Sequence, residues 1–123
     1  MDKHKIVAVD DTSFICETLA AWLKSSYDIK TFLSGQEALR YLEEHGADLI
    51  LLDYDMPVMT GYEVLMSIRT SKRIGKIPVI FLTGVTNERM EAEMLERGAN
   101  DFIRKPLDIT TLRERIGKQL AAT

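Results

Sequence analysis

The sequence predicts a doubly wound α/β fold, in which helices cover both faces of one parallel sheet. Short apolar runs of strand character alternate with longer stretches of helical spacing, which is the pattern of repeated strand–helix units. The run Leu49–Leu52 is apolar at every position, as expected for a strand buried on both faces. No linker, internal repeat or low-complexity tract interrupts the 123 residues, so we expect one domain spanning residues 1–123.

Five short runs rich in β-branched and other apolar residues are the predicted strands. In chain order they are Lys5–Val9, Tyr27–Leu33, Leu49–Leu52, Pro78–Leu82 and Asp101–Ile103. The three prolines, Pro57, Pro78 and Pro106, fall at predicted strand ends or in loops, where a missing N–H is tolerated. The proline positions therefore agree with the strand boundaries.

Helical spacing of apolar residues predicts the segments between the strands. The shared faces are Ile15, Leu19, Trp22 and Leu23 in the first helix, Ala38, Leu39 and Leu42 in the second, and Val64, Leu65 and Ile68 in the third. A fourth helix is expected over Glu88–Arg97, and a fifth runs from the N-cap Asp108 to about Leu120. Helices and strands thus alternate through the whole chain.

Boundary residues support these helices. Ser34-Gly35-Gln36-Glu37 has the form of a capping box at the start of the second helix. Gly46 and Gly98 come just after helical stretches, where a left-handed residue ends a helix at low steric cost.

Composition excludes several classes of protein. The chain has 16 basic and 19 acidic residues, for a formal net charge of −3, which disfavours direct nucleic-acid binding because that depends on neutralising phosphates. One cysteine, Cys16, allows neither an internal disulfide nor a multi-cysteine metal cluster. The longest apolar run, Leu19–Leu23, is far short of the ~20 residues that span a bilayer. We therefore expect a reduced, cytoplasmic protein with no membrane partner.

Charged or hydroxyl side chains come at the ends of four predicted strands. Asp10 and Asp11 follow the first strand, Asp53 the third, Thr83 the fourth and Lys105 the fifth. The second strand delivers no comparable group, which suits a lateral place in the sheet. Because ligands of open α/β sheets bind outside the carboxyl ends of the strands, we expect these side chains to form one site.

Taken singly, each of these residues has an ordinary structural role, as a turn former, a helix cap or a solvated lysine. Together, three converging carboxylates repel one another, and burying them unpaired costs several kcal/mol. A cation would offset that cost. Carboxylates with a backbone carbonyl and several waters are typical of a Mg²⁺ site, and Lys105 would add a second positive charge.

A carboxylate beside Mg²⁺ and a lysine is a poor general base, because both cations lower its basicity. It can still act as a nucleophile toward phosphorus, since metal and ammonium neutralise the charge on the transferring group. Thr83 could hydrogen-bond a phosphoryl oxygen. The residues therefore predict Mg²⁺-dependent phosphorylation of an aspartate.

Over essentially its whole length the chain resembles response regulator receiver domains. The matching blocks are Asp10-Asp11, the segment Asp53–Gly61 with the pattern D-x-x-M-P-x-M-x-G, Thr83-Gly84 and Lys105-Pro106. The resemblance implies the flavodoxin-like strand order, five strand–helix units and a role in a two-component phosphorelay. In that role the protein catalyses its own phosphorylation and dephosphorylation and is not an enzyme that acts on a separate substrate.

By this resemblance Asp53 is the phosphoacceptor, and it takes the phosphoryl group from a histidine of a sensor kinase or of a phosphotransfer protein. Asp11 and Asp53 would bind Mg²⁺ directly with the backbone carbonyl of Asp55, while Asp10 would act through a metal-bound water. Lys105 would pair with Asp53 before phosphorylation and with the phosphate afterwards.

The resemblance also implies a switch. Thr83 would turn toward the phosphate, and the ring of Phe102 would move into the space it leaves, although Phe102 could equally be an ordinary core residue. The bond from Lys105 to Pro106 is expected to be cis.

The fourth helix, fifth strand and fifth helix would form the surface that changes and controls a partner or output domain. Glu88–Arg97 carries four acids and two arginines, whereas Arg113–Lys118 carries three bases and one acid. These charges suit a homodimer or a charged partner; the alternative is a solvated helix face.

Asp55 and Val85 lie two residues beyond Asp53 and Thr83, so both should flank the path of the water that attacks the acyl phosphate. We expect apolar Val85 to slow self-dephosphorylation. Val85→Glu or Val85→Asn should then increase the measured decay rate of the phosphoprotein, and an unchanged rate would contradict the hypothesis.

Three other functions fit less well. Asp53-Tyr54-Asp55 satisfies the D-x-D core of haloacid-dehalogenase-like phosphatases, but that family usually places this motif after its first strand. A flavodoxin would present hydroxyls and amides to a phosphate where this chain has Asp10-Asp11. A receiver-shaped interaction module without phosphorylation would not need the full set of site residues. The 17 residues after Pro106 suffice for the last helix, so the chain either acts alone or is part of a longer regulator.

Overall fold

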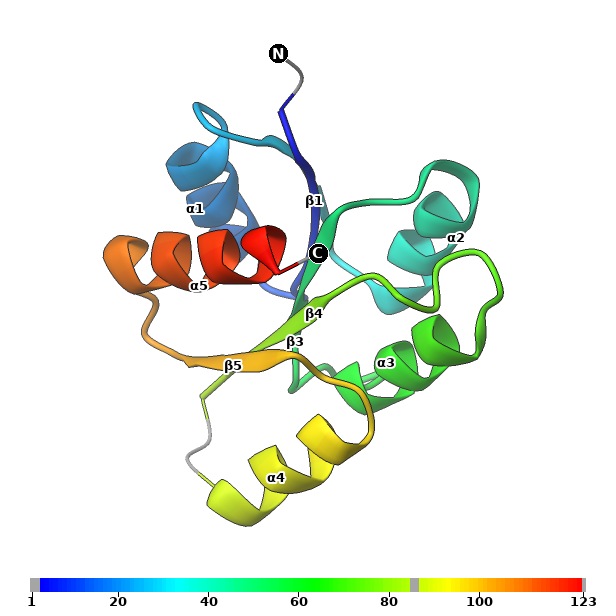
Figure 1. The fold of residues 1–123 in the computed structure, drawn as a ribbon. Coiled ribbons are helices and arrows are strands. Elements are labelled where there is room, and N and C mark those ends of the chain that lie inside the picture. The colour runs from blue at the N-terminus through cyan, green and yellow to red at the C-terminus, as the bar shows by residue number, and fades with distance from the viewer. Residues whose placement is uncertain (1–2, 85–86, 123) are drawn as a thin grey trace.

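The five apolar runs form the strands of one parallel sheet, and a helix follows each strand, as the sequence predicts. The computed structural model describes residues 3–84 and 87–122. Within them the strands are β1 (Lys5–Val9), β2 (Asp28–Phe32), β3 (Leu49–Asp53), β4 (Val79–Thr83) and β5 (Asp101–Arg104). The helices are α1 (Ser13–Leu23), α2 (Gly35–His45), α3 (Gly61–Thr70), α4 (Glu88–Glu96) and α5 (Ile109–Ala121) (Figure 1).

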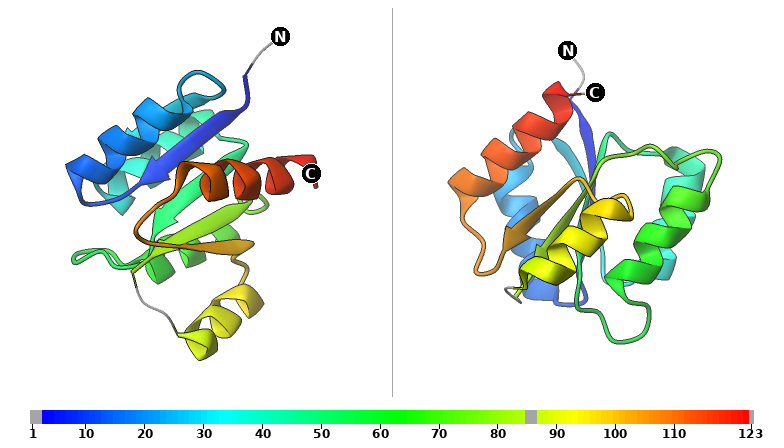
Figure 2. Two further views of the ribbon diagram at one scale, coloured as in Figure 1. Left: turned by 90° about the vertical axis from the view of Figure 1, so that its left-hand side faces the viewer. Right: turned by 60° about the horizontal axis from the view of Figure 1, so that its bottom comes forward.

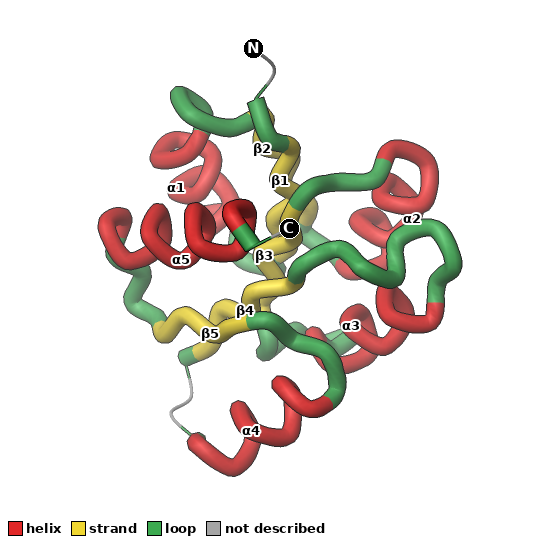
Figure 3. The backbone as a smooth tube through the Cα atoms, viewed as in Figure 1, coloured by secondary structure: helices red, strands yellow, loops and turns green. Residues whose placement is uncertain are grey.

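The strand order is β2-β1-β3-β4-β5, and every pair is parallel. This is the flavodoxin-like order that the resemblance implies. The central strands β3 and β4 are buried at every position, whereas the lateral strand β2 is half-exposed. Figure 3 shows the strands grouped in the middle of the molecule with the helices around them. All five strands point their carboxyl ends to the same edge of the sheet.

Successive residues of each strand point to opposite faces of the sheet and so belong to two separate cores, one on each face. One core packs under α1 and α5 and contains Ile6, Ala8, Leu51, Leu82, Leu19, Leu23, Leu112 and Ile116. The other packs under α2, α3 and α4 and contains Val7, Val9, Leu52, Phe81, Leu42, Val64, Ile68 and Met94. The two further views show these two layers of helices on either side of the sheet (Figure 2).

Most predicted helix boundaries are confirmed. Asp108 caps α5 by accepting the Thr111 N–H, and Gly46 and Gly98 have φ angles of 70° and 114°. The predicted capping box at Ser34 is only half formed among the described residues, because Ser34 accepts the Glu37 N–H but receives no bond in return.

The reciprocal capping box lies instead at the start of α3. The Thr60 hydroxyl accepts the Glu63 N–H, and the Glu63 carboxylate accepts the Thr60 N–H. This box holds the loop that leads from β3 into α3.

In the part of the chain that the structure describes, no helix has the length and apolar character needed to cross a bilayer.

Gly61 lets the first turn of α3 lie directly against the end of β3. A Cβ atom at this position would stand 2.5 Å from the Asp53 carbonyl oxygen, 2.8 Å from the Tyr54 Cα and 2.9 Å from a ring carbon of Phe81. Two of these neighbours are backbone atoms, which cannot move aside as a flexible side chain can. The absence of a side chain at Gly61 therefore allows the close approach of α3 to the end of β3.

We predict that Gly61→Ala lowers the free energy of unfolding by at least about 2 kcal/mol, because the methyl group overpacks against backbone. Gly117→Ala is the matched control. Gly117 lies exposed within α5, where a Cβ would face open space, so alanine should stabilise the helix by about 0.5–1 kcal/mol. Urea unfolding measures both values, and equal effects would contradict the packing argument.

Candidate functional site

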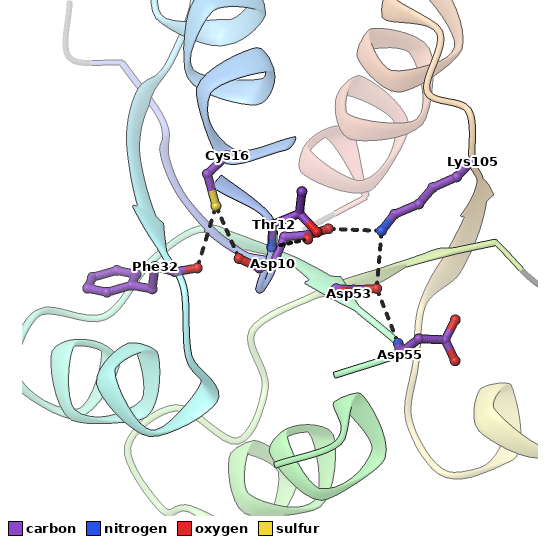
Figure 4. A network of polar contacts seen from close by, with 7 residues as sticks. All are labelled: Asp10, Thr12, Cys16, Phe32, Asp53, Asp55 and Lys105. Atoms are coloured by element: carbon purple, nitrogen blue, oxygen red, sulfur yellow. Dashed lines mark hydrogen bonds and ion pairs between the residues drawn. The ribbon is translucent and has the colours of Figure 1, made fainter. Parts of the chain in front are cut away.

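The polar residues predicted to meet at the carboxyl edge of the sheet do so. Asp10 follows β1, Asp53 is the last residue of β3, and Lys105 follows β5 (Figure 4). Asp10 is 0% exposed and Asp53 is 2% exposed. Two carboxylates are thus held out of water at the centre of the edge, with one ammonium group between them.

Backbone hydrogen bonds extend the sheet past the strand ends and set these side chains in place. The Asp10 N–H donates to the Phe32 carbonyl at 3.1 Å, and the Lys105 N–H donates to the Thr83 carbonyl at 2.7 Å. These bonds hold the backbone of each charged residue against the neighbouring strand, more rigidly than a free loop would.

Each buried carboxylate has hydrogen-bond donors. Asp10 accepts the Thr12 N–H at 2.9 Å and the Lys105 ammonium at 3.0 Å. Asp53 accepts the Asp55 N–H at 3.1 Å and the same ammonium at 3.3 Å. Lys105 thus bridges both carboxylates, as expected for buried charges, which are stable only when paired and hydrogen-bonded.

The Asp53 carboxyl is difficult to ionise in the metal-free protein. Burial and the nearby charge of Asp10 raise the pKa of Asp53 from 3.8 to about 6, and Lys105 and the Asp55 N–H only partly offset them. Burial alone would lower the pKa of Lys105, but its hydrogen bonds and charge interactions with Asp10 and Asp53 outweigh this and raise that pKa. One ammonium therefore does not fully compensate the two carboxylates.

A third carboxylate completes the cluster. Asp10, Asp11 and Asp53 each place one carboxylate oxygen so that all three oxygens lie within 4.8 Å of one another, and Asp11 is exposed to solvent. A set made only of oxygen donors, with one side open to water, fits a hard and strongly hydrated ion such as Mg²⁺ better than a soft metal. These residues could hold a divalent cation.

The other predicted residues of the site and of the switch lie on or after β4 and β5, except Val85. Thr83 is fully buried at the end of β4, and the Phe102 ring is 8% exposed on β5. The Lys105–Pro106 peptide bond is cis. Val85, predicted to flank the path of attacking water, lies outside the described residues.

Cys16, a buried residue of α1, lies beside the site, where the sequence analysis did not place it. Its thiol donates to the Asp10 carbonyl at 3.3 Å and to the Phe32 carbonyl at 3.6 Å. Burial and then the charge of Asp10 raise the pKa of Cys16. The thiol therefore supports the loop after β1 and is not an activated nucleophile.

The chain matches the sequence model of the response regulator receiver domain over residues 6–117. It belongs to the response regulator receiver family. The match excludes the dehalogenase-like phosphatase and the flavodoxin that the sequence left as alternatives, and it establishes a receiver domain of two-component systems.

Several relatives agree with this assignment. A probable cyclic di-GMP phosphodiesterase of Vibrio cholerae is 40% identical over 115 residues, which are 94% of this chain but 26% of that protein. The two-component response regulator ORR11 of Oryza sativa is 36% identical over 90% of this chain and 79% of its own length. The chain thus spans about a quarter of the first relative and most of the second.

Solved receiver structures have the same fold. The Vibrio cholerae chemotaxis protein CheY4 superposes with a TM-score of 0.90 at 30% identity, and the match covers 94% of this chain and 98% of that one. The signal receiver domain of a putative Luxo repressor protein from Vibrio parahaemolyticus also gives 0.90, at 26% identity, with coverage of 98% and 92%.

We predict that Asp53→Asn stabilises the metal-free receiver at about pH 7.5 by about 1–3 kcal/mol, because it removes a charge that folding buries. Since the folded-state pKa of Asp53 is raised from 3.8 to about 6, the destabilisation is absent below about pH 4. It develops as the pH rises through this window. The gain from the substitution should therefore shrink toward pH 4.5.

Urea unfolding with EDTA at both pH values measures this difference. Asp28→Asn, which removes an exposed carboxylate at the opposite edge of the sheet, is the matched control and should change stability by less than about 0.5 kcal/mol. A gain from Asp53→Asn that is the same at both pH values would show that repulsion at Asp53 is not its source.

Proposed function

We propose that this receiver is phosphorylated on Asp53 in a Mg²⁺-dependent reaction. The observation that carries the proposal is the Lys105 ammonium bridging the buried carboxylates of Asp10 and Asp53, at 3.0 and 3.3 Å, beside the exposed Asp11. The negative charge of the three carboxylates exceeds the positive charge of the single Lys105 ammonium. Such a cluster is suited to bind a cation and, with it, an anionic phosphoryl group.

In this proposal an Asp53 carboxylate oxygen attacks phosphorus, and the bond from phosphorus to the donor's histidine nitrogen breaks. The nitrogen keeps the bonding electron pair. Asp10, Asp11 and Asp53, with the Asp55 backbone carbonyl, would hold Mg²⁺, which when bound supplies neutralising charge. Lys105 already contacts Asp53 and would transfer that contact to the phosphoryl oxygens.

Thr83 would contribute its hydroxyl as a hydrogen-bond donor to a phosphoryl oxygen. It ends β4 beside Asp53, whose Cα pairs with Leu82 across the two strands. The phosphodonor class would be a sensor histidine kinase or a histidine phosphotransfer protein, as for two-component receivers generally. A cytoplasmic location stays a prediction.

The face formed by α4, β5 and α5 would transmit the phosphorylated state to a partner, which could be a second copy of the chain. A groove of about 470 Å³ opens on this face beside Phe102, Leu95 and Arg115. Within α4 four acids accompany one arginine, whereas α5 carries Arg113, Arg115 and Lys118. An isologous dimer would therefore place acidic α4 against basic α5.

Incubation of the chain with Mg²⁺ and acetyl phosphate, followed by intact mass measurement, tests the proposal. We expect one added phosphoryl group in the wild type and in Asp28→Asn. Asp53→Asn should carry none, because its amide is a much weaker nucleophile than the carboxylate. EDTA should abolish the adduct, because the cluster then lacks its second source of positive charge.

An adduct that persists in Asp53→Asn would show that another residue is the acceptor. If no adduct forms and beryllofluoride also fails to bind, the acidic cluster is structural. The chain would then be the receiver-shaped interaction module that works without phosphorylation.

A further inference from the structure

We infer that Phe81 is a positioning residue that couples the acceptor segment, which is Asp53 with Tyr54 and Asp55, to the surface formed by α4, β5 and α5. Three rings form a continuous ladder across the sheet. Tyr54 meets Phe81 edge-on, with ring centroids 5.4 Å apart and planes at 78°. Phe81 meets Phe102 at 5.4 Å with planes at 31°. Both separations fall within the range of attractive aromatic pairs.

One end of the ladder is attached to the phosphorylation site. Tyr54 directly follows Asp53, and its N–H donates to the Leu82 carbonyl at 2.9 Å. The next residue, Asp55, donates its N–H to the Asp53 carboxylate at 3.1 Å. A ligand that binds the Asp53 carboxylate competes with that bond and so displaces the backbone that carries the Tyr54 ring.

The middle of the ladder cannot absorb such a displacement. Phe81 is 0% exposed, and α3 leaves room for its ring only because Gly61 has no side chain, where a Cβ would stand 2.9 Å from a ring carbon. Close-packed interiors transmit strain and do not relax locally. Movement of Tyr54 is therefore passed through Phe81 to its other ring partner, Phe102.

The far end of the ladder opens to the surface. Phe81 and Phe102 are direct register partners on β4 and β5. Phe102 is 8% exposed and lines the groove of about 470 Å³ together with Leu95 and Arg104. A shift of this ring changes the shape of the groove that a partner would contact.

This path differs from the switch expected between Thr83 and Phe102, because it starts at the residue after the acceptor and runs through ring packing alone. The inference rests on the proposed function, since it adds a second path by which phosphorylation of Asp53 would affect the position of Phe102. Among the described residues Phe81 is the ring in contact with both Tyr54 and Phe102, so coupling by ring packing runs through Phe81.

A double-mutant cycle tests the coupling. The probe is beryllofluoride with Mg²⁺, and ¹⁹F NMR of the full chain measures its dissociation constant for the wild type, Tyr54→Leu, Phe102→Leu and the double variant. The same four proteins are then made with Phe81→Leu added. Independent residues would give a double variant whose change in dissociation constant equals the product of the single changes.

We expect a departure of at least about threefold from that product when Phe81 is present, and a departure within experimental error in the Phe81→Leu series. A purely structural role of Phe81 would weaken binding without changing the product rule. Tyr41→Leu is the control for Tyr54→Leu, because Tyr41 pairs with Phe32 at 5.1 Å and has no ring contact with the ladder. It should combine multiplicatively with Phe102→Leu.

A departure below about threefold with Phe81 present, or one that persists in the Phe81→Leu series, would overturn the inference. Where Phe81→Leu unfolds the chain, Phe81→Met removes the ring and keeps a flexible apolar side chain. Failure of the proposed function is distinguishable, because the wild type would then bind no beryllofluoride, and the inference would fall with it.

Discussion

The interaction on which the site depends is the Lys105 ammonium shared by the buried carboxylates of Asp10 and Asp53. Two carboxylates out of water repel each other strongly, and a single bridging cation removes only part of that cost. The raised pKa of Asp53, at about 6, expresses the remaining imbalance. The fold thus holds the carboxylates in a geometry that is unfavourable alone and is relieved when further positive charge arrives.

The parallel sheet is what makes this arrangement possible. Asp10, Asp53 and Lys105 lie at the ends of three different strands. Asp53 is held within the β3–β4 ladder, and Asp10 and Lys105 are held by backbone bonds that continue the ladder beyond β1 and β5. Gly61 then brings α3 against the end of β3, so the acceptor segment lies on a rigid support. The same support leaves the Tyr54, Phe81 and Phe102 rings in contact, which links the charged edge to the groove beside β5.

Much of this could be predicted from the sequence because strand ends are marked by abrupt changes from apolar to charged residues. The five strands, the helices on both faces and the convergence of Asp10, Asp53 and Lys105 follow from that pattern and from the geometry of parallel sheets. The sequence could not decide which of two segments of the S/T-x-x-E form makes a reciprocal capping box. Thr60 and Glu63 make both bonds, whereas at Ser34 only the bond from the Glu37 N–H is present. The contacts among the Tyr54, Phe81 and Phe102 rings could not be predicted from the sequence either, because they require the strand register that pairs Phe81 with Phe102.

A titration of the full chain with Mg²⁺, followed by backbone amide NMR, tests whether the Asp10, Asp11 and Asp53 cluster binds a divalent cation. We expect saturable shifts confined to the segments around Asp11 and Asp53, and their loss in Asp11→Asn. Shifts that never saturate, or that spread evenly over the surface acids, would contradict the claim that this cluster is a cation site.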